Sequence, residues 1–87
     1  MKKINLVGEK EGLGLSQLLG QRITLLCTNY FYTGVLAGVH ETEVLLQQPA
    51  IVYETGAWTD KAWKDVQALP QDLYVRLSAV EAYGVMK

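Results

Sequence analysis

The chain has 87 residues, of which 49% are hydrophobic, and it carries 8 basic against 9 acidic side chains. This length and composition predict one small domain, residues 13–87, preceded by a flexible arm at residues 1–12. Proteins that hold nucleic acid mainly through its phosphates carry a basic face, so the nearly balanced charge excludes a strongly basic binder of that class.

No apolar run in the sequence approaches the roughly 20 residues that a membrane-spanning helix needs. The apolar stretch at residues 4–7 is also too short for the core of a signal peptide, which takes about 7–15 residues. We therefore expect a cytoplasmic protein without a membrane partner.

The sequence holds one cysteine, Cys27, and one histidine, His40. A single cysteine excludes an internal disulfide, and the place of Cys27 in an alternating apolar segment favours a buried hydrophobe over a nucleophile. With no second histidine or cysteine, we expect neither a metal site of nitrogen and sulfur ligands nor another cofactor. The Gly12-Leu13-Gly14 segment lacks the Lys-Ser/Thr of a phosphate-binding loop and is interpreted as a flexible turn.

The first predicted elements are a short helix and a strand. Four leucines within residues 13–19 predict one or two helical turns, which Gly20 ends. Residues 22–27 alternate in polarity and predict a strand. The inward face of this strand is expected to hold Ile23, Leu25 and Cys27, and the outward face Arg22, Thr24 and Leu26.

A second, longer strand is predicted at residues 30–40. Gly34 and Gly38 share a face with Tyr32 and Leu36. Glycines at this spacing weaken a flat strand but allow a sharp bend, which favours a small barrel over an open sheet.

The third predicted strand begins at Glu43 and places Val44 and Leu46 inward. It contains Pro49, which has no amide hydrogen to donate to a central ladder, and it resumes at residues 51–53. We therefore expect the sheet pairing to change near Pro49.

The strand pattern is interrupted at residues 56–70. Opposite charges four residues apart and an apolar stripe predict a short amphipathic helix at residues 60–67, with Thr59 as its N-cap. Trp58 and Trp63 lie in this segment. Each tryptophan either covers the core, the more common case, or forms a platform for a ligand.

The last part of the chain predicts two short strands, at residues 72–77 and 79–84, joined by a tight turn at Ser78-Ala79. Alternation in the first of them points Leu73 and Val75 inward. The complete prediction is a mainly β protein with five strands after one short helix.

Two segments resemble the sequence motifs of one known family. Residues 18–46, LLGQRITLLCTNYFYTGVLAGVHETEVLL, resemble the first Sm motif, with an aromatic-x-Gly-x-Leu core at Tyr32, Gly34 and Leu36. Residues 74–80, YVRLSAV, resemble the second, with a hydrophobic-Arg-x-x-x-hydrophobic frame.

The resemblance to the Sm-like (Sm/LSm) family, in a divergent bacterial or phage-type form, covers most of residues 13–84. It implies a short N-terminal helix followed by a five-stranded, strongly bent antiparallel barrel of the SH3-like kind. Residues 56–70 would then be an inserted short helix or loop between the third and fourth strands.

Members of the family form closed rings by pairing the fourth strand of one subunit with the fifth strand of the next. Such pairing satisfies the open edges of a small sheet. The resemblance therefore implies a homo-oligomeric ring whose interface is formed by Asp72, Leu73, Tyr74, Val75 and Leu77 from one strand and Val80, Ala82 and Tyr83 from the other.

The resemblance also implies binding of single-stranded RNA around the central pore, because many members use the loops after the second and fourth strands in this way. An imidazole and a guanidinium can both stack on a base and donate hydrogen bonds to its edge. The corresponding residues here are His40, Glu41, Thr42, Glu43, Arg76 and Ser78.

Two of these positions and one beside them differ from the usual family pattern, since His40 replaces an Asp, Glu43 an Asn, and Leu77, next to Arg76, a Gly. A carboxylate only accepts hydrogen bonds and repels phosphate. A second function therefore stays open, that of a structural or adaptor ring that binds a protein partner through Trp58 or Trp63. We do not expect an enzyme, because His40 and its neighbouring glutamates lack a nucleophile or metal set.

Overall fold

The computed structural model describes residues 14–87, which form one antiparallel sheet of six strands. The prediction of a mainly β protein is thus confirmed, with six strands in place of five. The elements in chain order are η1 (Leu15–Leu18), β1 (Arg22–Cys27), β2 (Phe31–Val39), β3 (Glu43–Glu54), β4 (Asp65–Ala68), β5 (Leu73–Arg76), η2 (Leu77–Ala79) and β6 (Val80–Gly84).

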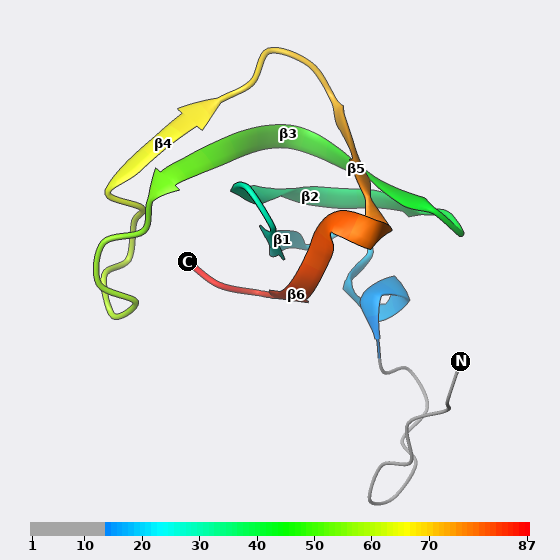
Figure 1. Ribbon diagram of the computed structural model, residues 1–87, viewed down its shortest axis with the longest axis horizontal. Coiled ribbons are helices and arrows are strands. Elements are labelled where there is room, and N and C mark those ends of the chain that lie inside the picture. Colours follow the sequence, from blue (N-terminus) through cyan, green and yellow to red (C-terminus); the bar gives the residue numbers. More distant parts are fainter. Residues whose placement is uncertain (1–13) are drawn as a thin grey trace, which may run out of the picture.

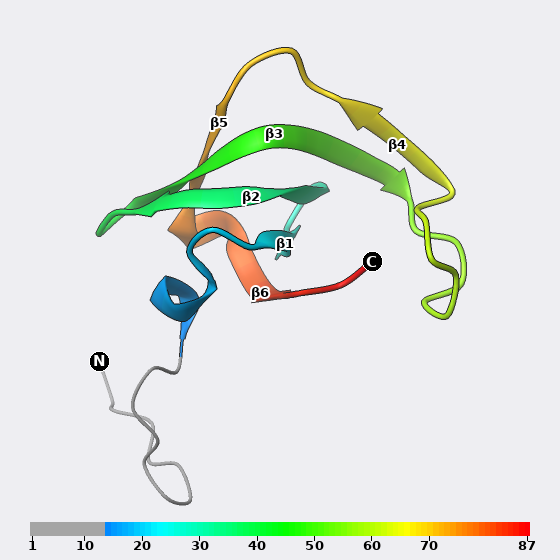
Figure 2. The ribbon, with the colours of Figure 1, turned by 180° about the vertical axis from the view of Figure 1, so that it is seen from behind.

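The sheet is strongly curved and open. Its strands follow the order β4-β3-β2-β1-β6, and β5 pairs with β3 beside β4. The long β3 arches over β2, and η2 carries the chain from β5 to β6 across the sheet (Figures 1 and 2). Among the described strands no ladder joins β5 to β6, so hydrogen bonds do not close a barrel.

The pairing of β3 changes at Pro49, as the sequence predicts. Residues 43–46 of β3 pair with β5, and residues 50–54 pair with β4. Between the two stretches Gln48 adopts a positive φ of 49°, and Pro49 is fully buried. The missing amide hydrogen of proline is tolerated there because β3 changes its outer partner at this point.

Gly34 and Gly38 lie where the β2–β3 register shifts, between Thr33 and Val35 and between Leu36 and Gly38. A Cβ on Gly34 would lie 3.1 Å from the carbonyl oxygen of Gln47, so β2 and β3 approach too closely there for a larger residue. At Gly38 the nearest atom would be 3.7 Å away, an ordinary contact. Both glycines mark irregular points of the ladder, but only Gly34 is required for close approach.

The core lies on the concave side of the sheet. Its buried residues include the inward-facing ones expected on the first and third strands; the set is Ile23, Leu25, Cys27, Leu36, Val44, Leu46 and Val75. Thr24 was expected to face outward but is fully buried. Because Ile23 and Leu25 are buried as well, β1 is covered on both faces at this point, which alternation along one strand cannot reveal.

Two predicted helices are wrong. Residues 15–18 form a single 3₁₀ turn, η1, in place of an α-helix. Residues 60–67 are not helical: a loop runs to Lys64, and β4 starts at Asp65. A helix of this length is marginal without tertiary support, whereas the backbone of β4 gains ladder pairing with β3, including Val66 opposite Val52.

Residues 1–12, predicted to form a flexible arm, lie outside the described residues. Within residues 14–87, no helix has the length and apolar character required to cross a membrane.

Candidate functional site

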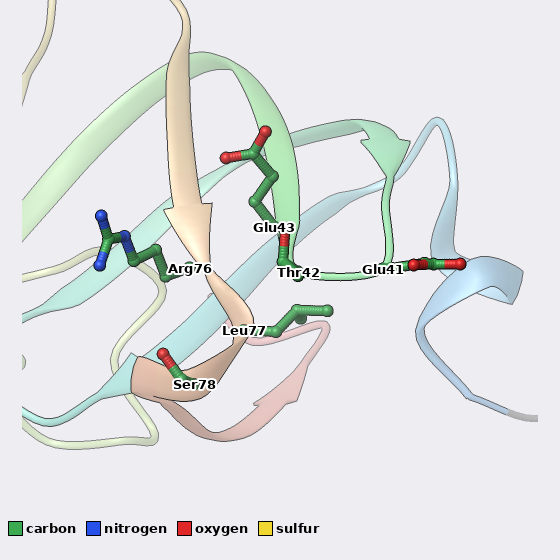
Figure 3. Close-up of a pocket in the computed structure, with 6 residues that line it drawn as sticks. All are labelled: Glu41, Thr42, Glu43, Arg76, Leu77 and Ser78. Atoms are coloured by element: carbon green, nitrogen blue, oxygen red, sulfur yellow. The ribbon is translucent and has the colours of Figure 1, made fainter.

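A pocket of about 520 Å³ lies where the β2–β3 turn meets the junction of β5 and η2 (Figure 3). Three of its lining residues come from the turn and three from the junction: Glu41, Thr42, Glu43, Arg76, Leu77 and Ser78. Segments more than thirty residues apart in the sequence thus form one site.

Backbone hydrogen bonds fix the two halves of the pocket relative to each other. The His40 amide donates to the carbonyl of Glu43 at 2.8 Å and closes the β2–β3 turn. The Leu77 amide donates to the carbonyl of Thr42 at 2.9 Å and ties η2 to this turn. Strand pairing and these two hydrogen bonds therefore fix the backbone from which the lining side chains project.

Arg76 provides the cation of the pocket. It lies opposite Glu43 in the β3–β5 ladder. The two side chains nevertheless form no ion pair, because the salt bridge found within residues 14–87 joins Lys64 to Glu54, at 3.3 Å. Arg76 is exposed, and its guanidinium points away from the Glu41 carboxylate, which projects toward the opposite side (Figure 3). The guanidinium is therefore available for an external anion or a planar base.

The pocket can offer hydrogen bonds of both kinds, because Thr42 and Ser78 add hydroxyl groups beside Arg76. Its two carboxylates, from Glu41 and Glu43, oppose the binding of phosphate. The arrangement suits a ligand that forms hydrogen bonds through its polar edges and stacks on Arg76. It is less suited to a ligand that is bound through phosphate charge alone.

Five of the six residues expected to bind RNA thus meet in one pocket. His40 is separate from them and lines a neighbouring pocket of about 320 Å³ with Gly38, Val39 and Tyr74 among others; Glu43 contributes to both. Leu77 lines the main pocket but was expected only at the subunit interface. The 3₁₀ turn that begins at Leu77 explains this position, and its sequence had been interpreted as the end of a strand.

The residues expected at the subunit interface divide into three groups. Tyr74 and Tyr83 are 63% and 41% exposed, so their side chains can contact another molecule. Val75 is buried in the core, so only its backbone could take part, and the half-buried Leu73 packs against the core. The rest of the set, Asp72, Leu77, Val80 and Ala82, is exposed or half-buried.

Among the strands that the structure describes, β5 pairs with β3 along one edge and has no strand partner along the other. The hydrogen bond from the Leu77 amide to Thr42 continues the register in which Arg76 lies opposite Glu43. Because hydrogen-bonded pairs alternate along an antiparallel ladder, the amides of Val75 and Leu73 also face β3. The amides of Tyr74 and Arg76 then face the open edge.

Trp58 and Trp63 lie together in the loop between β3 and β4. Their rings are perpendicular, with centroids 5.8 Å apart, and Trp58 also lies 6.5 Å from Phe31 of β2. Trp58 is 55% exposed, whereas Trp63 is half-buried. Neither residue belongs to the buried core cluster.

Reactive groups are sparse in the described part of the chain. Residues 14–87 contain no cluster of three His, Cys, Asp or Glu side chains that could hold a metal ion. Cys27 is buried; burial raises the pKa of its thiol, and the Glu81 carboxylate raises it further. A thiol in this environment is a poor nucleophile.

Comparisons with protein-family models, with curated proteins and with solved structures returned no match to this chain. Functional inference therefore depends on the geometry described above and on the resemblance of the two sequence motifs.

Proposed function

We propose that this protein is an Sm-like, ring-forming protein that binds single-stranded RNA in the pocket between the β2–β3 turn and η2. The observation that carries the proposal is the position of β5 and β6. Within residues 14–87 they are edge strands on opposite sides of one curved sheet, each paired with one other strand, and η2 joins them directly.

The outer edges of β5 and β6 lie on opposite sides of the sheet, and this arrangement allows head-to-tail assembly. When β5 of one subunit pairs with β6 of the next, the sheet continues across the contact and each subunit still offers one edge of each kind. The curvature of the sheet gives each contact a rotation, and the proposed ring requires that this rotation divide a full turn with no translation along the axis. Exposed Tyr74 and Tyr83 add aromatic contact area at this interface.

Ring closure repeats the Arg76 pocket once per subunit. In this arrangement Arg76 stacks on a base, while Thr42 and Ser78 form hydrogen bonds with its edge or with the ribose. A weak site repeated around a ring gains affinity by multivalent binding, which compensates for the two carboxylates in each pocket.

A titration of fluorescently labelled oligo-U and oligo-A at low and moderate salt tests this function. We expect saturable binding that weakens as salt rises, and Arg76→Ala should weaken it at least about tenfold. Arg22→Ala is the matched control, because Arg22 is also an exposed arginine but does not line the pocket. An absence of binding at low salt, or equal effects of the two variants, would contradict RNA binding at this site.

The alternative is a ring that acts as a structural or adaptor component and binds a protein partner with little or no RNA. Glu41 and Glu43 in the pocket and the exposed Trp58 favour this function. The same titration separates the two, because an intact oligomer that binds neither oligonucleotide supports the adaptor. We propose a non-enzymatic role in both cases.

A further inference from the structure

Lys87 places its ammonium group between the two tryptophans of the β3–β4 loop. The Nζ atom lies 4.9 Å from the centre of the Trp63 ring and 5.7 Å from that of Trp58. Nζ also donates hydrogen bonds to the backbone carbonyls of Thr55 and Ala62. We call these two rings and two carbonyls the ammonium cage.

The cage satisfies both requirements of a primary ammonium group. Aromatic faces within about 6 Å of a cation attract it through the ring quadrupole, and tryptophan is the strongest of the aromatic residues in this respect. An ammonium group also carries three hydrogen-bond donors, and the Thr55 and Ala62 carbonyls accept from Lys87. A quaternary ammonium could use the rings but could donate no hydrogen bond to either carbonyl; the Thr55 carbonyl would keep only its bond from the Lys64 amide, at 3.4 Å.

The loop that forms the cage is held by contacts independent of Lys87. The Asp60 amide donates to the carbonyl of Ala57 at 3.0 Å, and the Thr55 hydroxyl donates to the carbonyl of Gly56 at 2.8 Å. Gly56 has a positive φ of 70°, which lets the chain turn there. Phe31 contacts Trp58 from β2. The cage is therefore expected to persist when Lys87 leaves.

The internal ligand can be exchanged at small structural cost. Lys87 follows β6, which ends at Gly84, so its displacement breaks no strand pairing among the described residues. An open cavity of about 440 Å³ adjoins the cage and is lined in part by Trp63, Val66 and Lys87. This space can take the aliphatic part of an incoming side chain.

We propose that the ammonium cage is a recognition site for the unmodified lysine side chain of a partner peptide, and that Lys87 occupies it as a competing internal ligand. The site is independent of ring formation and of the Arg76 pocket. Lys61 and Arg22 also line the adjoining cavity, so a peptide with one lysine is preferred over a strongly basic one.

The probe for this site is N-acetyl-lysine methylamide, titrated while tryptophan fluorescence is recorded. Lys87→Met removes the internal ammonium and keeps an unbranched apolar side chain, one atom shorter than that of lysine. If Lys87 fills the cage most of the time, this variant should bind the probe at least about fivefold more tightly than the unmodified chain, because the competent state is no longer rare. The double variant with Lys87→Met and Trp58→Leu should bind the probe at least about threefold more weakly than Lys87→Met alone. The fluorescence of Trp63 still reports binding in this variant.

Three comparisons complete the test. N-acetyl-norleucine methylamide should not bind, the trimethylated lysine probe should bind more weakly than the unmodified one, and Tyr53→Leu, at an exposed aromatic outside the cage, should change nothing. The proposal is overturned if folded Lys87→Met protein shows no saturable binding or binds no more tightly than the unmodified chain. Equal binding of the norleucine or trimethyl-lysine probe overturns it as well.

Discussion

At the scale of single residues, two buried threonines illustrate how differently one side chain can contribute. Thr24 of β1 and Thr33 of β2 lie opposite each other in the ladder, and both are almost fully buried. The Thr33 hydroxyl donates to the carbonyl of Ile23 at 2.9 Å. The Thr24 hydroxyl has no hydrogen-bond partner within the described part of the chain.

Replacement of each threonine by valine should therefore have opposite effects on stability. Thr24→Val removes an unsatisfied buried hydroxyl and should raise the free energy of unfolding by about 1 kcal/mol. Thr33→Val leaves the Ile23 carbonyl without its donor and should lower it by about 1–2 kcal/mol. Urea unfolding measures both. A loss of stability in both variants would contradict the structure around Thr24.

The buried thiol of Cys27 predicts a dependence of stability on pH. Burial and the Glu81 carboxylate raise its pKa above the ordinary value of 9.0 in the folded state. The stabilising contribution of the protonated thiol is complete below that value and is lost as pH rises toward the folded-state pKa. The free energy of unfolding should thus fall from about pH 9 upward.

Urea unfolding between pH 8 and pH 10 tests this dependence, and Cys27→Ala should show a shallower fall over the same range. Burial also raises the pKa of Tyr32 above its ordinary value of 10.0, so a decline at higher pH should persist in the variant. Identical slopes in both proteins would show that the thiol does not contribute.

At the scale of elements, the bend of β2 depends on one glycine more than on the other. An alanine Cβ at Gly34 would meet the backbone of Gln47 and Pro49 and the Cβ of Leu46, all within 3.3 Å. Gly34→Ala should therefore cost about 1–3 kcal/mol of unfolding free energy, because backbone must move. Gly38→Ala, which meets only ordinary contacts, should stay within about 0.5 kcal/mol. Thermal unfolding of the pair measures the difference, and equal losses would contradict the close approach at Gly34.

The sequence was most informative where local patterns determine structure. Alternation places β1 and its core residues correctly, and Pro49 correctly marks the change of partner in β3. The opposite charges around residues 60–67 suggested a helix, because four-residue charge spacing is a local signal, whereas β4 forms through pairing with a distant strand.

Local sequence patterns are likewise insufficient to predict all of the two sites. The resemblance to the Sm motifs assigned Glu41, Thr42, Glu43, Arg76 and Ser78 to one site, and these five residues line one pocket. It also assigned His40 to that site, whereas His40 lines the neighbouring pocket. The ammonium cage was missed, because Lys87 lies far from Trp58 and Trp63 in the sequence and no local pattern connects them.

At the scale of the whole molecule, the proposed ring depends on backbone donors of β5 that face away from β3. Tyr74→Pro removes one of these donors and should leave the internal β3–β5 ladder intact, since the Tyr74 amide takes no part in it. Tyr74→Thr keeps the amide and serves as the control. We expect the proline variant to be monomeric and the threonine variant to remain assembled, as measured by light scattering after gel filtration. Assembly of both, with unchanged mass, would exclude pairing through this edge.

Native mass spectrometry of the unmodified chain at micromolar concentration tests the central claim most directly. Head-to-tail pairing of β5 with β6 predicts a single closed species with one defined number of subunits, because in a ring every β5 edge is paired with a β6 edge and none is left for a further subunit. A clean monomer at that concentration would contradict the ring, and an open-ended series of masses would contradict its closure.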